Sequence, residues 1–152
     1  MNQQKKSEFI EKVLDVRRVT RVVAGGKRFR FRATLVIGDE NGRVGVGLAK
    51  GADVAQAVEK SRRDAQKNLI TVNLKDNRTI PYEVEAKYSA ARVRLKPAKT
   101  GHGLIAGGAC RTVLELAGVK DISAKILGRT SNKLTNALAT IEALKQIQNH
   151  QG

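Results

Sequence analysis

The most prominent chemical feature of the sequence is a dense group of cationic side chains near the N-terminus. Positions 17 to 32 carry seven positive charges and no acid, at Arg17, Arg18, Arg21, Lys27, Arg28, Arg30 and Arg32. Guanidinium groups bind phosphate oxygens in a bidentate fashion, and arginine outnumbers lysine here. The cluster therefore predicts binding to a polyanion with an affinity that falls as salt rises. A solubilising face without a partner is the alternative, and interspersed acids would favour it.

A second candidate phosphate site is the glycine-rich segment from Gly45 to Asp53, which leads into a predicted helix. Free N–H groups and the helix dipole would favour an anion there, and Lys50 adds a full charge. The outer side of the same predicted helix carries further cations. We include Arg63 and Lys67 among the candidate nucleic-acid contacts.

Enzyme sites receive little support from the remaining residues. Gly101 and Gly103 match the G-x-G-x-x-A variant of the dinucleotide fingerprint, and Asp121 lies about 20 residues further on. The strand before them, residues 92–96, is half cationic, whereas a central parallel strand should be apolar. His102 is one of two histidines, and no residue marks a catalytic partner for it.

The acids and the single cysteine also predict structural roles. Glu83 and Glu85 alternate with apolar residues as on a solvated strand face, and the acids do not cluster as a metal-dependent nuclease requires. Cys110 lies inside a predicted helix as a small buried hydrophobe and excludes a disulfide framework. We expect no catalytic residue, no metal site and no cofactor.

The charge of the whole chain supports the same prediction. Its 152 residues include 29 Lys and Arg against 14 Asp and Glu, a net charge of +15 that self-repulsion makes unfavourable without a polyanionic partner. Residues 1–76 contribute +8 (17 basic, 9 acidic) and residues 77–152 contribute +7 (12 basic, 5 acidic), so both halves are basic. No segment approaches the roughly 20 apolar residues of a membrane span. We expect a cytoplasmic protein without membrane association.

The candidate contacts lie on a predicted β-hairpin. The apolar pattern predicts strands from Phe9 to Val23 and from Phe29 to Ile37, joined by a turn at residues 24–27 that contains Gly25 and Gly26. A slip in the apolar phase predicts a β-bulge near Arg17 and Arg18. The period of two places Phe29 and Phe31 on one face of the second strand and the arginines on the other. The rings should therefore be buried, which makes base stacking by them the weaker interpretation.

The rest of the first half completes a β-β-β-α order. An Asn-Gly turn precedes a third strand at residues 43–47. Asp53, with Gln56 three residues later, predicts the N-cap of a helix. The expected buried positions of this helix are Val54, Val58, Ser61, Ala65 and Leu69. This order and the basic start of the helix resemble the double-stranded-RNA-binding module, which reads A-form shape through phosphate and 2′-hydroxyl contacts.

The second half reads β-β-α-β-α, after a polar stretch at residues 74–78 that we interpret as a domain boundary. Strands are predicted at residues 80–88, 92–96 and 119–127, with a helix at residues 108–117 that ends at Gly118. Ser131 is the predicted cap of the last helix. The fold class is α+β, with two small domains: residues 1–74 form the β-β-β-α domain and residues 75–152 a two-layer β-β-α-β-α sandwich.

Several motifs in register resemble those of the family of bacterial small-subunit ribosomal protein five (S-five). They are residues 22–29 (VVAGGKRF), residues 38–45 (GDENGRVG), residues 103–108 (GLIAGG) and residues 113–119 (VLELAGV). The likeness runs from about Phe9 to Gln148. It implies a double-stranded-RNA-binding-like N-terminal domain and a C-terminal domain of a kind also found in translational GTPases.

The resemblance further implies a structural protein of the ribosome. Such a protein binds small-subunit rRNA near the junction of body and head, contacts ribosomal proteins S-four and S-eight, lies near the path by which mRNA enters, and influences decoding accuracy. The family's glycine-pair hairpin reaches into rRNA, a role that here falls to Thr20 through Arg28. Two positions differ from the family pattern. Ala24 stands where the family usually has a basic residue, and Lys99 lies where it tends to have an acidic stretch. The alternatives are an architectural nucleic-acid-binding protein outside the ribosome and an enzyme acting on nucleic acid.

Overall fold

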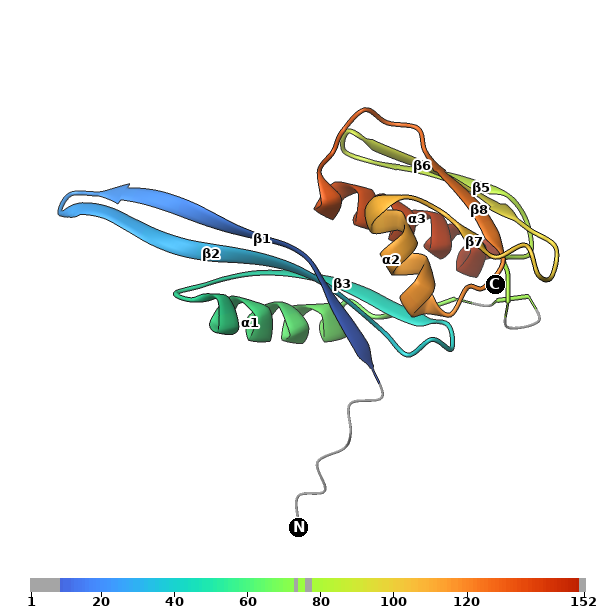
Figure 1. Cartoon of the computed structure of the whole chain (residues 1–152), viewed down its shortest axis with the longest axis horizontal. Coiled ribbons are helices and arrows are strands. Elements are labelled where there is room, and N and C mark those ends of the chain that lie inside the picture. Colours follow the sequence, from blue (N-terminus) through green and yellow to red (C-terminus); the bar gives the residue numbers. More distant parts are fainter. Residues whose placement is uncertain (1–8, 73, 76–77, 151–152) are drawn as a thin grey trace, which may run out of the picture.

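The computed structural model describes residues 9–72, 74–75 and 78–150, and only the backbone of Arg21, Lys27, Arg28 and residues 148–150. The chain forms two four-stranded sheets and three helices in these ranges, arranged as layers (Figure 1). None of the helices in the described ranges is long and apolar enough to cross a membrane.

The N-terminal sheet is antiparallel and dominated by one long hairpin. Its strands are β1 (Ile10–Val23), β2 (Gly26–Gly38), β3 (Arg43–Gly51) and β4 (Ile70–Thr71), in that spatial order. The β-bulge lies between Val13 and Asp15, so the prediction near Arg17 and Arg18 is wrong. The apolar residue that suggested it, Val19, pairs with Arg30 on the cationic face, where its side chain does not mark the core.

Helix α1 (Val54–Lys67) covers one face of this sheet. The predicted cap is confirmed: the Asp53 carboxylate accepts a 2.7 Å hydrogen bond from the Gln56 N–H. Ala57, Ser61 and Ala65 are buried, whereas Val54 is 44% exposed because it lies at the open end of the helix. The helix packs against Leu35 and Ile37, which the strand period correctly placed on the buried face.

The C-terminal sheet has the order β5-β6-β8-β7 and is antiparallel except between β7 and β8. Its strands are β5 (Val84–Tyr88), β6 (Ala91–Pro97), β7 (Leu104–Ile105) and β8 (Ile122–Ile126). The two-residue strands β4 and β7 are absent from the sequence-based prediction, since segments this short carry no periodic signal.

Helices α2 (Gly108–Ala117) and α3 (Lys133–His150) cover one face of this sheet. Helix α2 has the predicted bounds, and Gly118 ends it in the left-handed conformation, with φ at 92°. At the start of α3 the Asn132 side chain, rather than the predicted Ser131, accepts a 3.0 Å hydrogen bond from the Leu134 N–H. The α+β fold class is confirmed, with strands followed by a helix in the N-terminal part and strands and helices in the C-terminal part.

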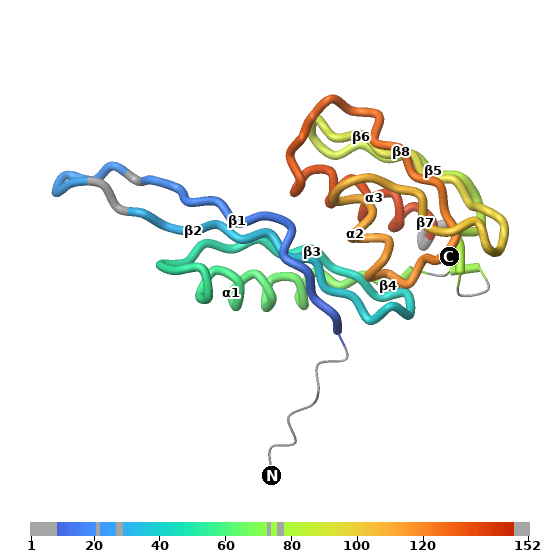
Figure 2. Tube along the Cα trace, in the orientation of Figure 1, coloured from blue at the N-terminus to red at the C-terminus, as the bar shows by residue number. Residues whose placement is uncertain are grey.

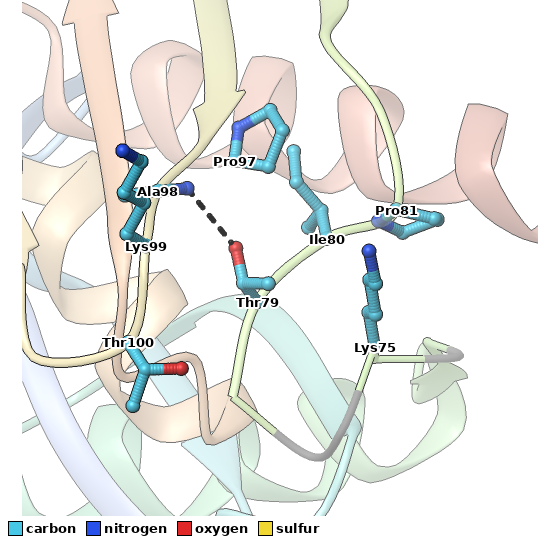
Figure 3. Close-up of a pocket in the computed structure, with 8 residues that line it drawn as sticks. All are labelled: Lys75, Thr79, Ile80, Pro81, Pro97, Ala98, Lys99 and Thr100. Carbon is cyan, nitrogen blue, oxygen red and sulfur yellow. Dashed lines mark hydrogen bonds between the residues drawn. The ribbon is translucent and has the colours of Figure 1, made fainter.

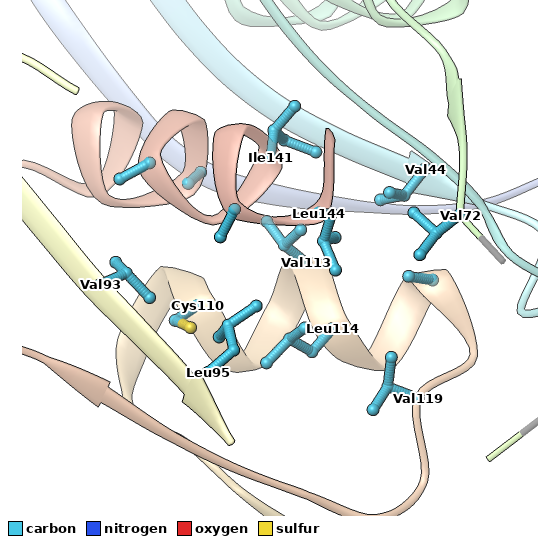
Figure 4. Close-up of a cluster of buried hydrophobic side chains, with 14 of the residues drawn as sticks. Val44, Val72, Val93, Leu95, Cys110, Val113, Leu114, Val119, Ile141 and Leu144 are labelled. Carbon is cyan, nitrogen blue, oxygen red and sulfur yellow. The ribbon is translucent and has the colours of Figure 1, made fainter. Parts of the chain in front are cut away.

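The second face of the N-terminal sheet is covered as well, by α2 and α3 (Figures 1 and 2). Val36, Val44 and Val46 of the N-terminal sheet belong to the same buried cluster as Val113 and Leu144 of these helices. Figure 4 shows Val44 beside Val113 and Leu144. One hydrophobic core therefore spans both halves of the chain. The domain boundary between residues 74 and 75 stays a prediction.

Backbone hydrogen bonds fasten the β2–β3 turn to the C-terminal end of α2. The Glu40 N–H donates to the Leu116 carbonyl at 2.9 Å, and the Gly42 N–H donates to the Ala117 carbonyl at 2.8 Å. Gly118 faces this turn so closely that a Cβ atom there would overlap the Glu40 carbonyl. The junction thus depends on a residue without a side chain at position 118.

Candidate nucleic-acid interface

The hairpin of β1 and β2 extends beyond the rest of the N-terminal domain (Figures 1 and 2). The β2–β3 ladder ends at the pair Phe31 and Gly51, while β1 and β2 continue to pair as far as Val23 and Gly26. Gly26 has a φ of 133°, a left-handed value that favours glycine, and no atom outside its neighbours lies within 4 Å of a Cβ built at Gly25. The glycine pair turns the chain at an exposed tip.

The ladder brings three of the predicted contacts into one row. Arg17 pairs with Arg32, and Arg32 pairs with Lys50, so the three side chains share one face across three strands. Arg17 forms a 2.8 Å ion pair with Asp15 on the same strand. Arg32 and Lys50 form no ion pair within the described residues. Like charges directly opposite each other are unfavourable in a sheet, and a bound polyanion would offset this cost.

Arg30 extends the row two pairs further along the hairpin, on the same face and opposite Val19. Its side chain is exposed, and it too has no ion pair in the part of the chain that the structure describes. Arg21 and Arg28 form the next pair but one on the backbone, and Val22 pairs with Lys27. The side chains of Arg21, Lys27 and Arg28 lie outside the described residues, so their predicted contacts stay predictions.

The arginines of the C-terminal sheet, unlike Arg30 and Arg32, form ion pairs with described acids of the same protein. Arg92 and Arg94 reach the Glu85 carboxylate at 2.9 and 3.3 Å, and Arg94 lies 3.5 Å from the Glu83 carboxylate. Their charges are neutralised within the protein by two acids that the sequence placed on a solvated face without indicating these ion pairs. The unneutralised cations on described strands β2 and β3 therefore mark the stronger candidate surface for phosphate.

The helix cations do not join the row. Helix α1 packs against the sheet face that bears Leu35 and Ile37, opposite the face that bears Arg32 and Lys50. Arg63 is paired with Glu59 at 3.0 Å, although both side chains are largely exposed, and Lys67 lies in the last turn. The candidate contacts predicted from the sequence therefore lie on two surfaces. One is the sheet face that bears Arg32 and Lys50, and the other is helix α1, which bears Arg63 and Lys67.

The glycine-rich segment before α1 has a packing role that sequence reasoning missed. The Asp53 and Gln56 side chains already cap the helix start, since the Gln56 side-chain oxygen accepts the Ala52 N–H at 2.7 Å. A Cβ atom at Gly45 would lie 2.6 Å from the Ala65 carbonyl oxygen, so this glycine is needed for the approach of strand and helix. These caps occupy the helix start at which a phosphate was expected, and Lys50 belongs to the row on β1–β3.

Phe29 contradicts the prediction that both rings are buried, because its side chain is 49% exposed. It lies on the face that α1 covers, but beyond the last β2–β3 pair and beyond the start of α1. The strand period correctly assigned the face. It could not show that no element reaches this part of it.

The loop with the dinucleotide-like glycines is held by an internal carboxylate. Asp121, 1% exposed, accepts hydrogen bonds from the N–H groups of Gly101 (3.1 Å) and Gly103 (3.0 Å) and from Arg78 Nε (2.8 Å). The glycine N–H groups that a pyrophosphate would need are therefore occupied. The bond from Gly103, together with Arg78, holds the pKa of Asp121 below its usual value against the effect of burial.

Asp121→Asn should lower the thermal unfolding midpoint at neutral pH, because an amide cannot accept from all three donors. The folded pKa is depressed, so the carboxylate stabilises the fold above the unfolded value of 3.8 and this contribution is lost as pH falls through the folded pKa. We expect the difference in unfolding midpoint between variant and wild type to shrink as the pH falls below about 3.8. Calorimetric scans of both proteins from about pH 7 to pH 3 test this, and a gap independent of pH would contradict it.

No catalytic arrangement is found in the described residues. They contain no group of three or more His, Cys, Asp or Glu side chains that could hold a metal ion. Cys110 is fully buried, and burial raises its pKa to about 11. A cavity of about 510 Å³ beside the β6–β7 loop is lined by Lys75, Thr79, Ile80, Pro81, Pro97, Ala98, Lys99 and Thr100 (Figure 3). None of these described lining residues is an acid, a histidine or a cysteine.

The fold and the charge distribution define a class: an α+β protein with the basic, projecting hairpin of a nucleic-acid-binding protein. Comparison with known families identifies the particular family to which the chain belongs. Residues 9–73 match the family model described as "Ribosomal protein S5, N-terminal domain", and residues 86–152 match "Ribosomal protein S5, C-terminal domain". The chain belongs to the family of ribosomal protein S-five.

Individual relatives agree with this assignment. The chain is 53% identical over 140 residues to "Small ribosomal subunit protein uS5c" of Spinacia oleracea, covering 92% of this chain and 45% of that protein. It is 52% identical over 145 residues to "Small ribosomal subunit protein uS5" of Gloeobacter violaceus, covering 95% and 65%. For the protein of Gracilaria tenuistipitata var. liui the identity is 49% over 150 residues, covering 99% and 87%. The chain thus spans about half the length of the spinach protein.

The family confirms three sequence-based predictions. These are the resemblance itself, the two-part α+β fold, and a ribosomal protein rather than an enzyme. The residues that contact RNA, the neighbouring proteins and the place within the subunit go beyond the family assignment.

Proposed function

We propose that this chain is a structural constituent of the small ribosomal subunit that binds rRNA near the junction of body and head. The observation that carries the proposal is the projecting hairpin with its row of unneutralised cations, Arg30, Arg32 and Lys50. Folded rRNA has a high density of phosphates that such a row of cations would bind, and a projecting hairpin could insert between its helices. The names of the relatives support the same role.

The finer parts of the proposal follow from the family. The hairpin from Thr20 to Arg28 would reach rRNA of the neck, and the remaining surface would contact ribosomal proteins S-four and S-eight beside the path of incoming mRNA. In this position the chain would support subunit assembly and decoding accuracy. An architectural role on nucleic acid outside the ribosome is the competing function, and its support is the net charge of +15 alone.

Directed hydroxyl-radical cleavage tests the placement. Cys110 is buried and its pKa is about 11, so a second cysteine introduced by Ala24→Cys at the exposed tip would be the reactive thiol. We expect iron tethered there to cleave small-subunit rRNA at the body–head junction after assembly of the tagged chain in a cyanobacterial host. The matched control is Thr100→Cys, which is exposed in the loop between β6 and β7 and should cleave elsewhere. This loop lies at the end of the molecule opposite the hairpin tip (Figure 1).

Two results would contradict the proposal. In the first, the tagged chain fails to sediment with small subunits after a high-salt wash. In the second, the purified chain binds duplex DNA at least as well as structured RNA at equal salt, which would favour the architectural alternative.

A further inference from the structure

The aromatic side chain of Phe29 is only partly covered by the rest of the protein. The chain has three Phe, two Tyr and no Trp, and the side chain of Phe29 is 49% exposed. The ring lies beyond the end of the β2–β3 ladder, where neither β3 nor α1 covers the sheet. Opposite it on β1 is Thr20, a small side chain. The fold itself therefore gives no reason for a large apolar ring at this position.

A cation stacks on the ring. The Arg18 guanidinium carbon lies 4.6 Å from the centroid of Phe29, within the range of a cation–π contact. Arg18 pairs directly with Phe31 across the hairpin and reaches Phe29 diagonally. It has no ion pair within the described residues. This contact holds the guanidinium plane and the ring together at the surface.

We propose that Phe29 and Arg18 form a stacking site for an unpaired base of RNA. The inference rests on the proposed function and adds a second mode of contact to it. Bases stack on aromatic rings and on guanidinium planes, and in single-stranded nucleic acid their faces are free. A paired A-form helix hides these faces, so the site selects single-stranded or bulged RNA.

The surroundings favour a nucleotide over an apolar protein surface. Arg30 and Arg32 lie on the opposite face of the same strand, so phosphates bound there would bring the backbone around the hairpin edge toward Phe29. A protein partner would instead have to leave the Arg18 charge desolvated beside an apolar contact, which is unfavourable. The hairpin would hold phosphates on one face and a base on the other.

The absence of tryptophan provides a direct reporter. In the full chain carrying Phe29→Trp, the introduced indole is the sole tryptophan, so its emission reports this position alone. We expect quenching on titration with an oligoadenylate of about 12 nucleotides and little change with a duplex RNA of about 16 base pairs. Quenching by both RNAs to the same extent, or by neither, would overturn the proposal.

Affinity measurements separate stacking from charge. Phe29→Leu keeps an apolar side chain but removes the ring, and should weaken oligoadenylate binding by about 5- to 150-fold while leaving the salt slope unchanged. Phe29→Tyr should bind like the wild type. Unchanged affinity in Phe29→Leu, with the wild type still binding RNA, would refute the stacking site alone. If the wild type binds neither RNA, the proposed function fails as well.

Discussion

Replacing Gly118 by alanine is expected to lower the free energy of unfolding by about 2 to 5 kcal/mol. Two costs combine at this position. With φ at 92°, a side chain strains the backbone by about 1 to 2 kcal/mol, and its Cβ overlaps the Glu40 carbonyl across the junction, which costs about 1 to 3 kcal/mol more. The Glu40 carbonyl cannot retreat freely, because the Glu40 N–H is bonded to Leu116.

Gly101 provides a matched control for this prediction. Its φ is 90°, nearly that of Gly118, but no atom outside its neighbours lies within 4 Å of a Cβ built there. Gly101→Ala should therefore show only the backbone cost of about 1 to 2 kcal/mol. Urea unfolding of both variants under identical conditions measures the difference. Equal losses would show that the β2–β3 turn and the end of α2 are not in close contact.

The double substitution Arg30→Ala and Arg32→Ala should have the largest effect on RNA binding. Each phosphate contact contributes about 0.7 to 0.9 to the slope of log affinity against log salt, so losing two should reduce the slope by about 1.4 to 1.8. Both arginines lack an ion pair in the described chain, so their removal leaves no described acid without its partner. The fold should be retained, because relieving like charges across from Lys50 is favourable.

The control removes the same charge from the other sheet. Arg92→Ala with Arg94→Ala also lowers the net charge by two, but these arginines are already paired with Glu83 and Glu85. Filter binding of small-subunit rRNA over a range of salt should give a slope close to wild type for this pair. If both double variants change the slope equally, net charge rather than the hairpin determines binding. A normal slope with reduced thermal stability in the hairpin variant would make its arginines structural.

Local signals in the sequence were sufficient for several elements. The bounds of α2 follow from its apolar spacing and from Gly118, and the start of α1 follows from Asp53 and Gln56 three residues apart. In each case the determining interaction lies within one turn of the helix. Because the interacting residues are close together in the sequence, a single sequence predicts these interactions well.

Features that depend on distant residues were harder to predict. The exposure of Phe29 depends on where β3 and α1 end, and Val19 misled the placement of the bulge because it lies half-buried on the cationic face of the hairpin, opposite Arg30. The burial of Val36, on the face that carries Arg30 and Arg32, depends on α2 and α3, more than 70 residues further along the chain. A strand pattern shows which residues share a face, and tertiary contacts decide which part of that face is covered.

The candidate interface shows the same division. The sequence identified the cations and the turn that positions them, but not the row that joins Arg17, Arg32 and Lys50, since strand register determines which residues lie opposite each other. Nor could it separate the neutralised arginines of β6 from Arg30 and Arg32 of β2, which form no ion pair with described residues. The acids that pair with Arg92 and Arg94 are recognisable only once β5 and β6 are aligned.

The hydrophobic core that joins both halves has a consequence for synthesis of the chain. Val44 and Val46 leave the ribosome about 100 residues before Leu144, which completes the cluster that buries them. At bacterial elongation rates this delay is about 5 to 20 s, during which one apolar face of the nascent N-terminal sheet lacks the complete cover that α2 and α3 provide together. Co-translational folding of this protein should therefore finish only after α3 has emerged, and chaperone binding to the nascent chain should be strongest in that interval.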